Sequence, residues 1–73
     1  MFIETVCFYQ HTKDTHPLAL NLNHVYDFRP GEMRLNGAAR NITIVTRKDV
    51  VGNLELDEPY PEFLARVQEM TQC

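Results

Sequence analysis

Hydrophobic periodicity changes once along this chain, near residue 57. Upstream of that point, apolar residues follow the two-residue alternation of strands, most clearly in residues 18–23, LALNLN. Downstream, apolar residues recur at spacings of three and four, the pattern of one face of an amphipathic helix. The helical stripe consists of Tyr60, Phe63, Leu64, Val67 and Met70. This order predicts a sheet followed by a single helix.

Four extended segments make up the predicted sheet. Residues 2–9, 41–47 and 50–56 are rich in β-branched and aromatic residues, and residues 18–28 alternate with a bend at the asparagines. Gly52 within the last segment predicts a bulge or a close backbone approach. We therefore predict an α+β fold with a small antiparallel sheet of about four strands and one C-terminal helix. The chain of 73 residues is expected to form a single domain, 1–73.

Residues 29–40, RPGEMRLNGAAR, separate two of these strands. Pro30 followed by Gly31 indicates a turn, because Pro presets one dihedral angle and Gly accepts the positive φ of a type II turn. Residues 29–48 carry five basic groups against Glu32 alone, although the whole chain has a net charge of −3. We predict that residues 29–40 form a mobile basic loop.

Two interpretations of the basic groups stay open. As a docking element, they would pair with carboxylates or phosphates, for which the planar guanidinium is well suited. As a solvated connection, they would keep an edge strand soluble. Under the first interpretation, the partner-binding residues are Arg29, Arg34, Arg40 and Arg47.

Tyr60 is the fifth predicted partner-binding residue, because an amphipathic ring can anchor an interface. Its acidic surroundings consist of Glu55, Asp57, Glu58 and Glu62. These carboxylates could meet a basic partner, or they could be the solvated start of the helix.

Catalytic and metal-binding patterns are weak. Cys7, His11, His16 and His24 lie within 18 residues, but they lack the closely paired ligands of a zinc site. Cys7 with His11 could act as nucleophile and base, yet no glycine-rich elbow or helix N-terminus is placed to activate the thiol. We expect no enzyme activity, no metal, no cofactor and no small-molecule ligand.

Charge and hydropathy restrict partners and location. The net charge of −3 and the pI near 5.4 argue against direct nucleic-acid binding, since affinity for nucleic acids comes mostly from neutralised phosphates. No apolar run approaches the roughly 20 residues of a membrane span. The first ten residues lack the basic and apolar regions of a signal peptide. A cytoplasmic protein is expected, in the host cytoplasm if a phage encodes it.

Two families resemble this chain. The stretches LNLNHVYDFRPG, ITIVT and LELDEPYPEFLARV resemble the FlbD/SwrD-type flagellar and swarming proteins, although residues 29–40 depart from that pattern. The length, the start at Met1 and the lack of catalytic motifs are similar to small lytic-phage regulators that bind host RNA polymerase, as in Xanthomonas phages. The second resemblance implies a protein partner and an effect on initiation and termination.

We therefore expect a non-enzymatic binding protein that docks on bacterial RNA polymerase and regulates transcription, by inhibiting initiation, by antitermination, or by both. One alternative is a small adaptor of the flagellar or swarming type. The other is a direct nucleic-acid binder.

Overall fold

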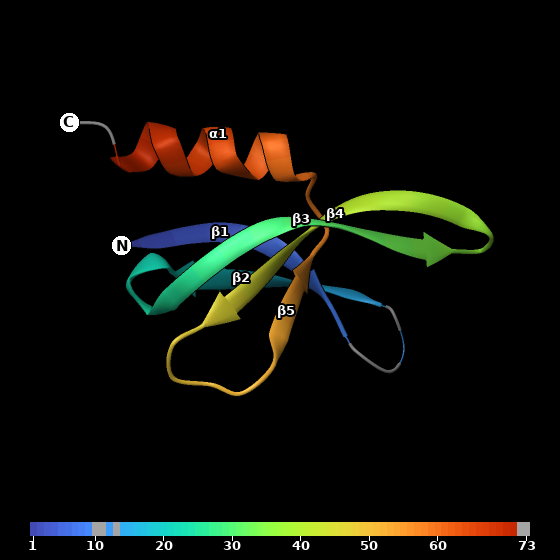
Figure 1. The fold of residues 1–73 in the computed structure, drawn as a ribbon, viewed down its shortest axis with the longest axis horizontal. Helices are drawn as coiled ribbons and strands as arrows, with labels where there is room; N and C mark the ends of the chain where they lie inside the picture. Colours follow the sequence, from blue (N-terminus) through green and yellow to red (C-terminus); the bar gives the residue numbers. More distant parts are fainter. Residues whose placement is uncertain (10–11, 13, 72–73) are drawn as a thin grey trace.

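Five strands and one helix make up the computed structural model, which describes residues 1–9, 12 and 14–71, with the backbone alone for Leu35 (Figure 1). The elements are β1 (Phe2–Phe8), β2 (Thr15–Asn21), the 3-10 turn η1 (Leu22–His24), β3 (Val25–Leu35), β4 (Ala38–Arg47), β5 (Asn53–Leu56) and α1 (Tyr60–Thr71). The antiparallel sheet has the order β2-β1-β5-β4-β3. The predicted α+β fold with a C-terminal helix is confirmed, with five strands in place of about four.

Two hairpins form most of the sheet. β1 pairs with β2 from Phe2↔Asn21 to Phe8↔Thr15, and β3 pairs with β4 from Val25↔Arg47 to Leu35↔Ala38. The short strand β5 lies between them. It pairs with four residues of β4, but its register with β1 holds the single pair Cys7↔Leu56 in the described part of the chain.

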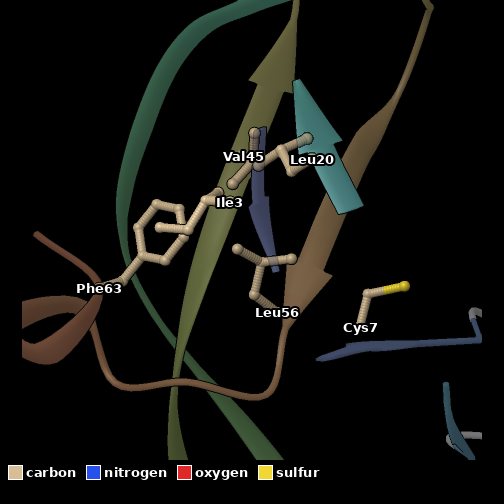
Figure 2. Packing of buried hydrophobic residues seen from close by; sticks show 6 residues of the cluster. All are labelled: Ile3, Cys7, Leu20, Val45, Leu56 and Phe63. Atoms are coloured by element: carbon tan, nitrogen blue, oxygen red, sulfur yellow. The ribbon is translucent and has the colours of Figure 1, made fainter. Parts of the chain in front are cut away.

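The main hydrophobic core lies between the sheet and α1. Its buried members are Ile3, Cys7, Leu20, Val45, Leu56 and Phe63. Figure 2 shows the ring of Phe63 pointing from α1 toward Ile3 and Val45. Phe63 is fully buried and makes an edge-to-face contact with Phe28 of β3, with ring centroids 5.2 Å apart. The helical spacing seen in the sequence thus produces the face that covers the sheet.

A second, smaller cluster lies on the other face of the sheet. It contains Phe8, Met33 and Ile42, with Ile44 packed against them. On β4, Ile42 and Ile44 alternate with the core residues Thr43 and Val45, so they point away from the helix. Both faces of β4 therefore bury side chains.

The predicted loop at residues 29–40 is wrong, because these residues form most of a β-hairpin. Pro30 and Gly31 lie inside β3, opposite Thr43 and Ile42. Proline is tolerated there since β3 is an edge strand, where its missing N–H removes no necessary hydrogen bond. Gly31 is required by packing: a Cβ at this position would lie 2.5 Å from Cδ1 of Ile44.

Asn36 and Gly37 form the turn of this hairpin, with φ angles of 52° and 80°. Two central residues with positive φ are the requirement of a type I′ turn, and Asn-Gly is its preferred sequence. The hairpin extends past the last β4–β5 pair, Thr43↔Leu56. We call its far part, residues 32–41, the arm. Figure 1 shows the arm projecting away from the rest of the molecule. The whole structure, arm included, measures 41 × 24 × 19 Å.

Two further strand boundaries differ from the prediction. Residues 18–28 are split by η1 into the end of β2 and the start of β3, which adds the fifth strand. Gly52 precedes β5 and lies in the bend of residues 48–52, so the predicted bulge within a strand is wrong.

Replacing Gly31 with Ala should destabilise the fold by about 1–3 kcal/mol, because the added methyl group forces Ile44 out of its position. Urea denaturation would measure the loss. In an Ile44→Val background, which lacks the Cδ1 atom, the same replacement should cost less. An equal cost in both backgrounds would contradict this explanation.

Candidate functional site

The five predicted partner-binding residues do not form one surface. On β3, Arg29 and Arg34 point to opposite faces because strand side chains alternate. Arg40 lies opposite Met33 and therefore shares the face of Arg29, four residues away along β3. Arg34 and Arg40 belong to the arm, whereas Arg29, Arg47 and Tyr60 lie outside it.

Two of the arginines are engaged within the chain. Arg40 donates to the carboxylate of Asp57, with Nε 2.7 Å from Oδ1. Arg29 Nη1 lies 3.4 Å from Asp27 Oδ1 and donates to Thr46 Oγ1 at 3.1 Å. Both guanidinium groups are about half exposed, so solvent screens these pairs and each contributes at most about 1 kcal/mol. The positive charge counted in the sequence is therefore partly balanced in the fold.

Arg34 differs from these two residues. It is exposed, lies opposite Ala39 and is two residues from the Asn36–Gly37 turn. In the described part of the chain, no carboxylate lies within ion-pairing distance of Arg34. Arg34 is thus the arginine of the arm that is free to meet a partner.

Arg47 lies at the opposite end of β4, where it is half-buried. It lines two hollows, one beside Leu20 and Asn21 and one beside Phe8 and Tyr9. Its Nε atom is buried and has no hydrogen-bond partner among the described residues. Arg47 thus lies at the end of the β3–β4 hairpin that is remote from the arm.

Tyr60 packs within the molecule. Its ring centroid lies 5.8 Å from that of Phe28, with the rings tilted by 44°, and the residue is half-buried. This contact fixes the first residue of α1 against β3.

Glu58 is the polar residue that holds the helix start to the sheet, and sequence reasoning missed this role. Its Oε1 accepts hydrogen bonds from Thr5 Oγ1 at 3.1 Å and from Arg66 Nη1 at 2.6 Å. Its main-chain carbonyl accepts from Thr43 Oγ1 at 2.8 Å. Both threonines are buried, and the side chain of Glu58 is 13% exposed. Asp57 and Glu58 are thus paired within the chain and do not form a free acidic surface.

Cys7 contacts His16 across the first hairpin. The Sγ atom lies 3.0 Å from Nε2 of His16, and the imidazole stacks on Tyr9 with ring centroids 4.2 Å apart. Burial raises the pKa of the Cys7 thiol above its ordinary value of 9.0, an effect that the positive charge of Arg47 reduces. The neutral thiol is therefore favoured, which is the opposite of an activated nucleophile. His11, the base considered from the sequence, lies outside the described residues.

No other chemical centre emerges from the described residues. Within residues 1–9, 12 and 14–71, no three Cys, His, Asp or Glu side chains gather closely enough to hold a metal ion. The same part of the chain contains no helix with the length and hydrophobicity needed to cross a bilayer. Comparisons with protein-family models, curated proteins and solved structures found no match.

Replacing Glu58 with Ala should lower the free energy of unfolding by about 1–3 kcal/mol, because the hydroxyl of Thr5 and the guanidinium of Arg66 lose their acceptor. Glu69→Ala is the control, since Glu69 is exposed on the same helix and should change stability by less than about 0.5 kcal/mol. Chemical denaturation measures both. Equal losses would show that Glu58 has no special role.

The Cys7 thiol should react slowly in the folded protein. In a Cys73→Ser chain, where Cys7 is the remaining cysteine, alkylation by iodoacetamide at pH 8 should be slower than in the urea-unfolded chain by more than about tenfold. Mass spectrometry follows the modification. Similar rates in the two states would mean that Cys7 is accessible in solution.

Proposed function

We propose that this chain is a non-enzymatic binding domain that docks on bacterial RNA polymerase through the arm and thereby regulates transcription. The observation that carries the proposal is the projection of residues 32–41 beyond the sheet (Figure 1). Apart from Met33, which belongs to the second cluster, the described side chains of the arm are exposed, so the arm offers a long surface to a partner.

The backbone of the arm supports docking by strand pairing. β5 ends its pairing with β4 at Thr43, so the residues of the arm pair with each other and with no further strand among the described residues. Both edges of the arm therefore present backbone N–H and C=O groups. Such edges can take an additional strand from a partner.

The side chains of the arm favour a close approach of this kind. Ala38 and Ala39 are exposed and small, and Arg34 opposite Ala39 carries a free guanidinium. Small side chains allow backbone contact, while an arginine provides bidentate pairing with a carboxylate. The partner surface that fits the arm is thus an acidic one with an accessible strand edge.

The choice of polymerase comes from the resemblance to small lytic-phage regulators. That resemblance implies effects on both initiation and termination. A docking domain without catalysis can produce such effects by changing which factors its partner binds. Direct nucleic-acid binding is less well supported, because Arg29 and Arg40 are already paired with carboxylates of the chain.

A second candidate function is that of a flagellar-type adaptor. The element order supports it: a strand, an asparagine-containing turn, strands and a C-terminal helix follow one another from β2 to α1. The side chain of Asn21 caps η1 by accepting a hydrogen bond from the N–H of Asn23 at 3.0 Å. Such an adaptor is expected to bind no polymerase.

The polymerase interaction can be tested with purified components. Biolayer interferometry with Xanthomonas RNA polymerase, as core enzyme and as holoenzyme, should detect binding of the wild-type chain. Arg34→Ala should weaken the affinity about fivefold or more, the loss typical of a contributing interface residue. Lys48→Ala is the matched control, since it removes an exposed cation outside the arm and should leave the affinity unchanged.

Two results would contradict the proposal. Absence of binding at micromolar polymerase would remove polymerase as the partner and favour the adaptor. Equal weakening by Arg34→Ala and Lys48→Ala would show general charge attraction in place of docking through the arm.

A further inference from the structure

A groove of about 560 Å³ lies between the first hairpin and the start of α1. One side is apolar, formed by Val6, Pro17 and Ala19 of the β1–β2 hairpin. The other side carries Asp57 and Glu58, which connect β5 to the helix. Among the residues that the structure describes, none of the arm lines this groove.

The groove follows a backbone edge that has no strand partner. The N–H of Asp57 donates to the carbonyl of Val6 at 2.7 Å, so this carbonyl points toward β5. The carbonyl of Glu4, two residues earlier, points to the same side because alternate residues of a strand share one orientation. On its other side, Glu4 pairs with Ala19 of β2. On the side that faces β5, no strand of the described part of the chain pairs with Glu4, because β5 ends at Leu56.

A guanidinium already occupies part of this edge. Arg66 reaches from α1 and donates to the main-chain carbonyl of Glu4 and, at 2.6 Å, to Oε1 of Glu58. The side chain of Arg66 remains 42% exposed, so it lies over the groove without closing it. The groove thus binds an arginine side chain of its own chain through one backbone and one carboxylate oxygen.

The charge of the lining favours a basic ligand. Three acidic residues, Glu4, Asp57 and Glu58, line the groove together with one basic residue, Arg66, which is paired with Glu58. Asp57 is paired with Arg40 from outside the groove, whereas the exposed carboxylate of Glu4 has no ion-pair partner among the described residues. Glu4 is therefore available to a cation that enters along β1.

We propose that this groove is a binding site for an extended, arginine-bearing segment of a partner protein. The segment lies along residues 2–6 of β1 and pairs with the unpartnered backbone edge. Its arginine binds the carboxylate of Glu4, and its small apolar side chains contact Val6 and Ala19. The arm touches this site through the Arg40–Asp57 ion pair, but the proposal does not depend on the identity of the partner that the arm binds.

Peptide titration tests this site. The probe is the pentapeptide acetyl-Val-Arg-Val-Arg-Val-amide, added to the ¹⁵N-labelled full chain, with amide chemical shifts as the readout. We expect the largest shifts at the amides of residues 4–6, 18 and 19, which line the groove and carry backbone N–H groups. Glu4→Gln should weaken binding about fivefold, while Glu69→Gln, which removes the same charge outside the groove, should change it less than about twofold.

Two further peptides distinguish specific binding in the groove from nonspecific electrostatic attraction. The same peptide with an N-methyl group on its central valine cannot donate a strand hydrogen bond at that position and should bind more weakly. The peptide with glutamate in place of both arginines should not bind. Undetectable binding of the arginine peptide, shifts centred on the arm, or equal effects of Glu4→Gln and Glu69→Gln would each overturn the proposal.

Discussion

The fold depends on how a strand of four residues holds two hairpins together. β5 joins the β3–β4 hairpin through four register pairs and the β1–β2 hairpin through the pair Cys7↔Leu56. So short a ladder cannot fix the angle between the hairpins without support. Glu58, two residues after β5, supplies this support. Its carboxylate accepts a hydrogen bond from Thr5 on one hairpin, and its main-chain carbonyl accepts one from Thr43 on the other. Phe63 then packs the helix over the same junction.

The shortness of β5 also creates the two surfaces on which function is proposed. Because β5 ends at Leu56, β4 continues beyond β5 toward the arm with one edge unpaired. For the same reason, the N-terminal part of β1 has no partner on the side of β5. Arg66 covers part of the β1 edge, and nothing in the described part of the chain pairs with the edges of the arm. One local feature, the turn of the chain at Asp57 out of the sheet, thus leaves two open edges on opposite sides of the junction.

The sequence predicted those features that repeat over many residues. Alternation and helical spacing are summed over whole elements, so the sheet, the helix and its buried face were recoverable. Features set by single contacts were not. Pro30-Gly31 has the composition of a turn, yet it is extended because it pairs with Thr43 and Ile42 of β4. The turn belongs to Asn36-Gly37, the dipeptide that a type I′ hairpin prefers. Likewise, the Cys7–His16 contact depends on a cross-strand register that no local pattern reveals.

The distribution of free charge on the surface also could not be predicted from the sequence, because it depends on which residues pair in the fold. A count along the sequence places most of the basic residues in one segment, but the fold pairs Arg40 with Asp57, 17 positions away, and Arg29 with its neighbour Asp27. Alternation then sends Arg34 to the other face of the hairpin from these two. Within the part of the chain that the structure describes, a segment that is strongly basic in sequence therefore has one guanidinium at the arm without an ion-pair partner, that of Arg34. In the docking proposed for this chain, specificity would therefore come from the shape and backbone edges of its surfaces, with single charges selecting the orientation of the partner.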